Sequence, residues 1–113
     1  MKLWIDDVRP APDGYVWVKS VNKAKSKIAK LEYRNEKEQK ECWGMRLGPD
    51  LLEVIDIDHD AGDYVSDGGD YIKLLDWLEA TGRNYPIRIH TANPVGAANM
   101  RAIIERNGWK EVK

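Results

Sequence analysis

The chain has 113 residues, with 18 basic and 19 acidic side chains, a formal net charge of −1 and one cysteine. This length predicts one domain over residues 1–113 with a core of its own, and the single cysteine excludes an internal disulfide and a cysteine-rich zinc site. We expect a cytoplasmic protein, because the first residues lack a signal peptide's apolar stretch and no apolar run is long enough to span a membrane.

The charges are unevenly distributed along the chain. Residues 51–80 hold nine acidic side chains and one base, whereas the flanking segments 21–50 and 81–113 are net basic. An acidic segment alone would repel nucleic acid, so we do not expect duplex DNA as a partner. The lack of a long apolar run predicts no membrane partner either. Between basic segments, it is compatible with a cation site beside a phosphate site, or with an ordinary solvated surface.

The first half of the chain predicts two strands and a helix. Residues 2–6 form an apolar strand that ends in acids, and residues 15–19 form a strand rich in β-branched and aromatic side chains. About eight residues link them, too few for the usual helical crossover, so the strands are either antiparallel or joined by an unusually tight loop. Ser20 caps a helix from Val21. Its pattern decays over 33–50, which either extends the helix or forms an insertion.

The middle of the chain predicts a third strand, a loop and a second helix. Residues 51–58 carry the apolar run of a central strand. The following loop, 58–70, is dense in aspartate and glycine. Apolar side chains at helical spacing predict a helix over 71–80, with Asp70 as its N-cap and Gly82 as its stop.

The last third predicts a fourth strand at 86–91 and a final helix. Asn93 caps this helix and proline starts it, and its buried side is supplied by Val95, Met100, Ile103 and Ile104. Residues 109–112 could add a short last strand. Strands that alternate with helices predict an α/β fold, with a mostly parallel sheet of four or five strands covered on both faces.

In such sheets, ligands bind beyond the carboxyl ends of the strands. The unusual polar residues of this chain fall at three predicted strand ends: Asp6, Asp7 and Arg9 after the first, Asp58, His59 and Asp60 after the third, and His90, Thr91 and Asn93 at the fourth. Because parallel strands end at one edge of a sheet, we expect these side chains to converge.

The carboxylates predict a metal site. Asp6, Asp7, Asp58 and Asp60 offer the hard oxygen ligands that Mg²⁺ or Mn²⁺ prefers. A single aspartate at a strand end more often begins a turn, but a doublet facing an Asp-His-Asp triplet favours a bound divalent cation.

The two histidines predict proton transfer. His59 and His90, with Asp58 beside them, are candidate catalytic residues, because a pair of imidazoles could protonate a leaving oxygen and activate an attacking one. That division of labour suits cleavage of a cyclic phosphate ester. The alternative for His90, inside an apolar strand, is a hydrogen-bonded core residue.

Three further residues are candidates for binding the phosphate. Arg9 could grip it with two hydrogen bonds, or equally pair with a carboxylate. Thr91 and Asn93 lie where the last helix begins, and the free amides of that turn favour an anion. Capping is the alternative role for Asn93 and does not exclude a role in the site.

The segments LWIDDVRPAP, DIDHDAG and IRIHTANPVG are similar to the cyclic-phosphate processing receiver-like family, a divergent relative of the response-regulator receiver domain. The resemblance implies a receiver-like, flavodoxin-like three-layer sandwich whose first helix is reduced to a loop. It also implies Mg²⁺-binding roles for Asp6 and Asp7, the phosphoacceptor position for Asp58 and a phosphate-binding hydroxyl for Thr91.

The same resemblance implies a function. Its family is expected to hydrolyse or process cyclic phosphates on nucleotides or RNA ends, in phage and bacterial conflict systems. The two histidines have no counterpart in the receiver phosphorelay. Two alternatives remain: a receiver-like signalling module phosphorylated on Asp58, and a non-catalytic module that binds a nucleotide or a partner protein.

Overall fold

The computed structural model describes residues 1–41 and 51–113. Its elements are β1 (Lys2–Ile5), β2 (Tyr15–Val18), α1 (Val21–Glu41), β3 (Val54–Ile57), a 3₁₀ turn η1 (Gly62–Tyr64), α2 (Ile72–Ala80), β4 (Ile87–Ile89) and α3 (Pro94–Asn107). Within these residues no helix combines the length and apolar composition needed to cross a bilayer.

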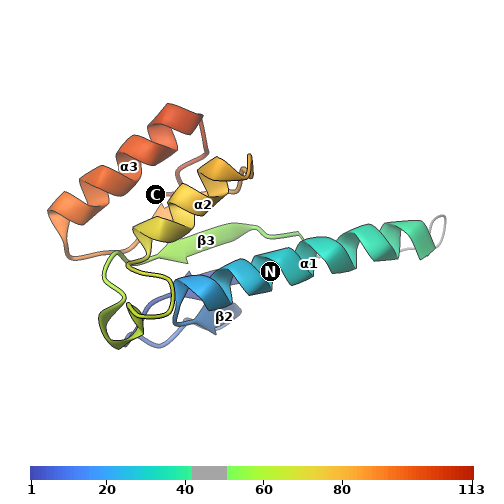
Figure 1. The fold of residues 1–113 in the computed structure, drawn as a ribbon, viewed down its shortest axis with the longest axis horizontal. Helices are drawn as coiled ribbons and strands as arrows, with labels where there is room; N and C mark the ends of the chain where they lie inside the picture. The colour runs from blue at the N-terminus through green and yellow to red at the C-terminus, as the bar shows by residue number, and fades with distance from the viewer. Residues whose placement is uncertain (42–50) are drawn as a thin grey trace.

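The four strands form one parallel sheet in the order β2-β1-β3-β4 (Figure 1). Leu3 of β1 lies between Val16 of β2 and Ile55 of β3, and Ile55 lies beside Ile87 of β4. The α/β fold class is therefore confirmed, with β3 central and β2 at an edge. Residues 6–14 form a loop of turns and bends, so of the two alternatives for β1 and β2 the parallel one, with a tight loop, is correct.

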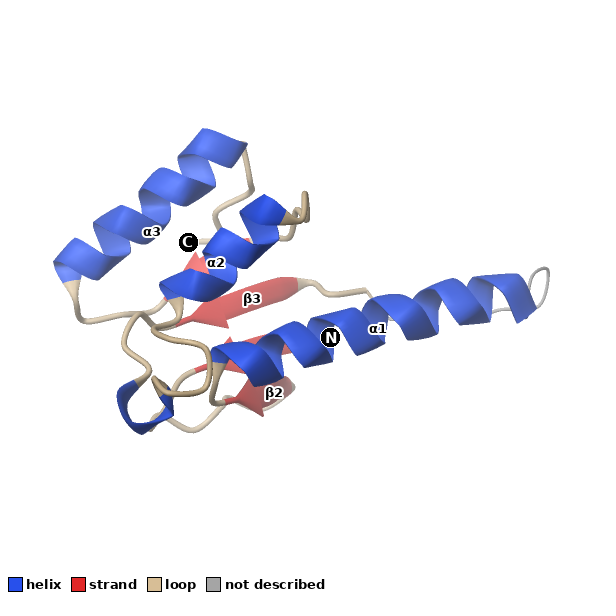
Figure 2. Ribbon diagram, in the orientation of Figure 1, coloured by secondary structure: helices blue, strands red, loops and turns tan. Residues whose placement is uncertain are grey.

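All three helices pack on one face of the sheet, with α2 between α1 and α3 (Figure 2). Alternate strand residues Leu3, Ile5, Ile55 and Ile57 point into this layer and are fully buried. Both crossovers, β2-α1-β3 and β3-α2-β4, move the chain the same way along the sheet, and right-handed connections then place their helices on the same side.

The second face of the sheet carries polar and aromatic side chains. Trp17, Trp4, Asp56 and Arg88 are neighbours across the four strands. The loop after β1 folds toward this face, because Trp4 donates from its indole nitrogen to the Arg9 carbonyl at 2.8 Å. The sequence predicts helices on both faces of the sheet, but the helices of the described residues all lie on one face. The link between β1 and β2 is too short to hold a helix on the other face.

Helix α1 is longer than the sheet beneath it. Its 21 residues span about 31 Å, and its C-terminal part extends beyond the strands (Figure 1). Glu32 fixes the middle of this helix to the loop before β4, through two-point hydrogen bonding with Arg83 and a bond from Tyr85. Burial raises the pKa of Glu32, but these partners outweigh it and hold the pKa below its ordinary value.

Several local expectations are confirmed and others are corrected. Ser20 and Asn93 cap α1 and α3 as predicted, accepting from the Lys23 and Gly96 amides. Asp70 does not cap α2: its carboxylate accepts from the Ala61 amide instead, and residue 71 holds the cap position without a side-chain bond.

The structure also corrects or refines three other local predictions. Val95 is 70% exposed instead of buried, because Gly96 takes the inward position of that turn. Residues 109–112 contribute one parallel bridge, between Glu111 and Ile87, and not a full strand. For segment 33–50, the helix extends through Glu41, and the remainder lies outside the described residues.

Candidate active site

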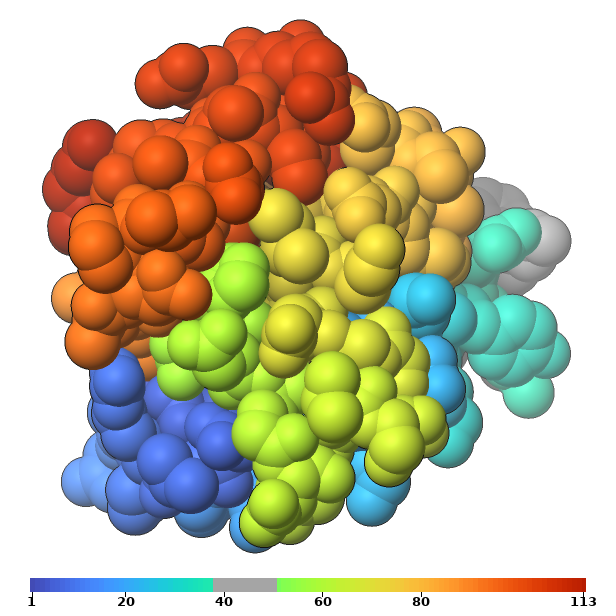
Figure 3. Space-filling view, turned by 60° about the vertical axis from the view of Figure 1, so that its left-hand side comes forward, coloured from blue at the N-terminus to red at the C-terminus, as the bar shows by residue number. Residues whose placement is uncertain are grey.

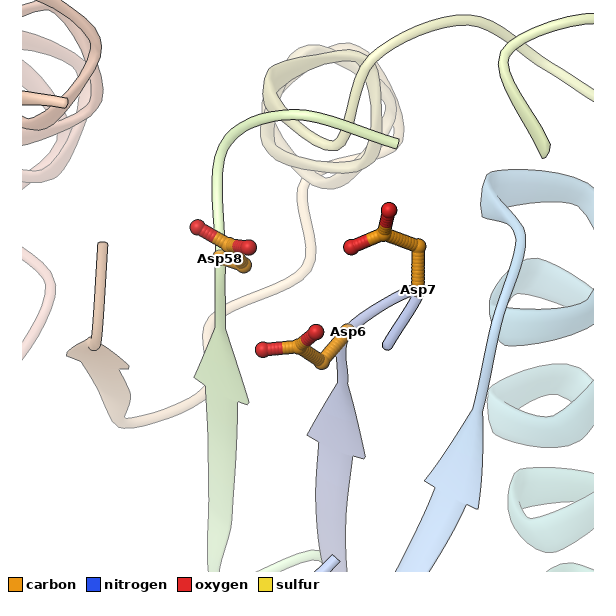
Figure 4. Close-up of side chains that lie close together, drawn as sticks. All are labelled: Asp6, Asp7 and Asp58. Atoms are coloured by element: carbon orange, nitrogen blue, oxygen red, sulfur yellow. The ribbon is translucent and has the colours of Figure 1, made fainter. Parts of the chain in front are cut away.

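Three carboxylates meet at the carboxyl ends of β1 and β3 (Figure 4). Asp6 and Asp7 follow β1, Asp58 follows β3, and each offers an oxygen such that all three oxygens lie within 4.8 Å of one another. Asp6 is fully buried and Asp58 is nearly so. Three convergent carboxylate oxygens match the ligand chemistry of Mg²⁺ or Mn²⁺.

The electrostatics of these carboxyl groups differ. Burial raises the pKa of Asp6, but amide bonds from Arg9 and Val8 and the contact with His90 outweigh it, so the pKa is lowered. Burial, together with the charges of Asp6 and Asp58, raises the pKa of Asp7. The protein therefore compensates the negative charge of Asp7 less than that of Asp6.

Gly62 makes room for the Asp7 carboxylate. A Cβ atom at position 62 would lie 2.2 Å from Asp7 Oδ2, and the residue has a φ of 54°, which side-chain-bearing residues rarely adopt. Gly62 thus lets the loop after β3 approach the end of β1, and this loop therefore lies against the carboxylate cluster.

His90 lies between two buried carboxylates. Its Nε2 is 2.9 Å from Asp6 Oδ2, its Nδ1 is 2.6 Å from Asp56 Oδ1, and its side chain is only 8% exposed. The Trp4 ring stacks on the imidazole, with centroids 3.8 Å apart and planes at 5°. His90 therefore holds the second oxygen of Asp6 in place from beneath the cluster, on the sheet face without helices.

Asp56 is the residue of this region that the sequence reasoning missed. It is buried on β3, accepts from Arg88 Nη1 at 2.9 Å and contacts His90. A charged residue inside the apolar run LLEVIDID was the available signal, since a buried carboxylate needs partners. Strand alternation places Arg88 and His90 on one face of β4, but only the register of β3 and β4 shows that Asp56 lies on the same face.

His59 has a different set of contacts. Its Nδ1 lies 2.8 Å from Asp60 Oδ1, and its side chain is 16% exposed. The ring packs against the first turn of α3, where a Cβ at Gly96 would come within 2.4 Å of it. The Asp60 carboxylate is 62% exposed and lies outside the three-carboxylate cluster.

The predicted phosphate-binding residues surround the same strand ends. Arg9 Nη1 donates to the His90 carbonyl at 3.2 Å, and its Nε lies 3.8 Å from Asp6, with the side chain 48% exposed. Thr91 Oγ accepts from the Asn93 amide, and Asn93 Oδ1 caps α3. Both residues thus shape the first turn of that helix.

The structure brings most of the predicted residues to one end of the sheet, but the two histidines bind different carboxylates there. In Figure 3, the chain segments after β1 (blue), β3 (green) and β4 (orange) adjoin on one surface. His59 belongs to the rim of this surface with Asp60, whereas His90 is bound to Asp6 and Asp56 below it.

The chain matches the sequence model of a known protein family. The sequence model of the cyclic-phosphate processing receiver domain matches residues 1–106, which include every strand end described above. No curated protein and no solved structure matches the chain.

Proposed function

The chain belongs to the cyclic-phosphate processing receiver domain family, and we propose that it is a metal-assisted phosphoesterase that opens a cyclic phosphate. The substrate is a nucleotide or an RNA end. The single observation that carries the proposal is the cluster of Asp6, Asp7 and Asp58, whose oxygens converge within 4.8 Å at the end of the sheet.

These three carboxylates are the proposed ligands of a divalent cation. They fit the group, because convergent carboxylates repel one another and a hard cation relieves that repulsion. Burial, together with the charges of Asp6 and Asp58, raises the pKa of Asp7, which is consistent with such repulsion. When bound, such a cation polarises a phosphoryl oxygen and neutralises developing charge. Arg9 and the α3 amides after Thr91 and Asn93 are proposed to bind the remaining phosphate oxygens.

His59 is the proposed proton-transfer residue. Opening the ring by water forms one phosphorus–oxygen bond, breaks the ring phosphorus–oxygen bond and delivers a proton to the leaving oxygen. With Nδ1 held by Asp60 at 2.8 Å, the imidazole has Nε2 left for this transfer. We assign Asp60 to orienting His59, a role that its exposed position outside the carboxylate cluster supports.

His90 is proposed to position Asp6. Both of its ring nitrogens are engaged with carboxylates, Nε2 with Asp6 at 2.9 Å and Nδ1 with Asp56 at 2.6 Å, so neither is left to exchange a proton with a substrate. The variant His90→Gln should therefore shift the cation concentration that half-saturates the rate. If it lowers turnover at saturating cation as strongly as a His59 variant, both histidines act in proton transfer.

A substrate panel tests this proposal. Purified protein is incubated with 2′,3′- and 3′,5′-cyclic nucleotides and with RNA that ends in a cyclic phosphate, each with Mg²⁺, Mn²⁺ or a chelator. The proposal expects a phosphomonoester product from at least one substrate, only with a cation, and none from Asp58→Asn. Absence of product throughout the panel would refute it.

Phosphorylation of Asp58 is the alternative that the same cluster supports, because the resemblance to receivers implies a phosphoacceptor role for this residue. Incubation with acetyl phosphate separates the two functions. A stable acyl phosphate on Asp58, without ring opening of any cyclic substrate, would favour the signalling module. Binding of a nucleotide without either reaction would favour a non-catalytic module.

A further inference from the structure

A second feature of the surface lies along the open edge of β2. A groove of about 490 Å³ runs between this strand and the first turns of α1, and this volume is typical of ligand-binding pockets. Its lining includes Lys19, Lys23 and Lys27, the rings of Trp17 and Tyr64, and valines of β2. We call it the β2 groove.

The charge of the β2 groove is uncompensated. Lys23 and Lys27 are one helical turn apart on α1 and therefore lie on the same side of the helix. Within the described part of the chain, none of the three lysines forms an ion pair with a carboxylate, and none of the lining residues is acidic. The Asp67 carboxylate is already bound by Ser20 and Asn22, and these hydrogen bonds, followed by the charge of Lys23, lower its pKa.

The aromatic rings of the β2 groove lie beside the ammonium group of Lys19. The Lys19 ammonium lies 4.5 Å from the Trp17 ring centroid and 5.9 Å from that of Tyr64. Basic side chains interleaved with aromatic rings are the combination that binds single-stranded nucleic acid, where ammonium groups contact phosphates and rings stack on bases.

The loop after β3 and the side chain of Tyr71 link the β2 groove to the carboxylate cluster. The loop after β3 carries Gly62 against Asp7 and, two residues later, Tyr64 into the groove. Tyr71 connects the same two places: its hydroxyl donates to the Lys19 carbonyl at 2.8 Å, and burial and the charges of Asp7, Asp6 and Asp58 raise its pKa. A nucleic-acid strand that ends at the carboxylate cluster could therefore continue into the β2 groove.

We propose that the β2 groove binds the nucleotides that precede the terminal phosphate of a single-stranded RNA. This deepens the proposed function and rests on it for the position of the RNA end, because it selects an RNA end over a free cyclic nucleotide as the substrate. Charge complementarity favours this occupant, since a phosphodiester chain matches three lysines that form no ion pair with the described carboxylates, and bases match the rings.

Fluorescence anisotropy with a labelled RNA of roughly eight nucleotides, ending in an unreactive 3′-phosphate, measures the interaction without catalysis. Three lysine–phosphate contacts predict that log K falls with log salt at a slope of about −2. Affinity should then weaken about 20-fold between 50 and 200 mM salt.

Charge-reversal variants on one helix provide the matched comparison. Lys23→Glu and Lys27→Glu should each weaken RNA binding and flatten the salt dependence by at least about 0.7. Lys25→Glu changes the net charge equally on the same helix, but its ammonium lies over Trp77, away from the groove, so it should bind as the wild type does. Tyr64→Ala should weaken binding about fivefold or more through lost stacking.

The outcomes separate this inference from the proposed function. Equal binding by Lys23→Glu, Lys27→Glu and Lys25→Glu, or displacement of the RNA by an acidic peptide at matched charge and ionic strength, would overturn the groove. Ring opening of cyclic mononucleotides would then still stand. RNA binding that depends on these lysines, in a protein that opens no cyclic phosphate, would support the groove and refute the phosphoesterase.

Discussion

Replacing Asp7 with asparagine should have opposite effects with and without a divalent cation. Asp7 shares the cluster with two carboxylates whose oxygens lie within 4.8 Å. At that separation, Coulomb's law gives about 1 kcal/mol of repulsion for each pair in water and about 3 kcal/mol at an effective dielectric constant of 20. Asp7→Asn removes this repulsion and should raise the cation-free stability by about 1 kcal/mol or more.

With a cation the order reverses. A ligand at a hundredfold excess over its dissociation constant stabilises the folded state by about 2.7 kcal/mol, or roughly 10 °C in melting temperature for a domain of this size. Asp7→Asn lacks one of three ligands and should lose most of that gain. Melting curves of both proteins in chelator and across a Mg²⁺ or Mn²⁺ titration measure the two effects.

The pH dependence follows from the raised pKa of Asp7. The folded state holds this proton more tightly than the unfolded state, so without cation the Asp7 carboxyl favours folding increasingly as pH falls toward its ordinary pKa of 3.8. Asp7→Asn should lose that contribution. Asp63→Asn, an exposed aspartate of the same loop, is the control and should match the wild type. An equal cation-induced rise in the melting temperatures of Asp7→Asn and wild type would refute the reasoning.

Three further predictions address other parts of the structure. Gly62→Ala should weaken cation affinity about tenfold, because its Cβ atom would displace the Asp7 carboxylate. The control Gly82→Ala has a similar φ of 70° but open space around it, so it should cost only about 1 kcal/mol of stability. A cation titration of both variants measures the difference, and equal affinities would contradict the prediction. Glu32→Gln should lower stability by about 1 to 2 kcal/mol at pH 7. Because the Glu32 pKa is lowered, that stability is present above its ordinary pKa of 4.5 and lost as pH falls through the lowered pKa, so urea denaturation at pH 7 and pH 3 should differ less in the variant than in wild type. His59→Ala should lower turnover by about 10²- to 10⁴-fold and Asp60→Asn less, measured at saturating cation; normal turnover in His59→Ala would exclude proton transfer by this residue.

The strand ends could be predicted because their signals are local. Alternating or continuous apolar runs identify the strands, and the polar residues directly after them must then lie at one edge of a parallel sheet. The Asn93 cap was equally predictable, since a side-chain oxygen before a helix satisfies an amide within three residues. These rules place Asp6, Asp7 and Asp58 together without knowledge of the tertiary structure.

The predictions that failed concern side chains whose contacts are made with residues distant in the sequence. Asp70 has the sequence of an N-cap, but the Ala61 amide, nine residues away, competes for its carboxylate. Val95 has the spacing of a core residue, but the inward place beside His59 admits only a glycine, at position 96. The pairing of Asp56 with His90 required the register of β3 and β4. Propensity does not encode such competition.

The dependence of the ring-opening rate on cation concentration is the most direct test of the central claim. The account predicts that the rate rises from none in chelator to a plateau, with the same midpoint as the cation-induced gain in wild-type melting temperature, and that Asp58→Asn shows neither. A rate that is unchanged by chelator, or no ring opening at a cation concentration that saturates the thermal shift, would contradict it.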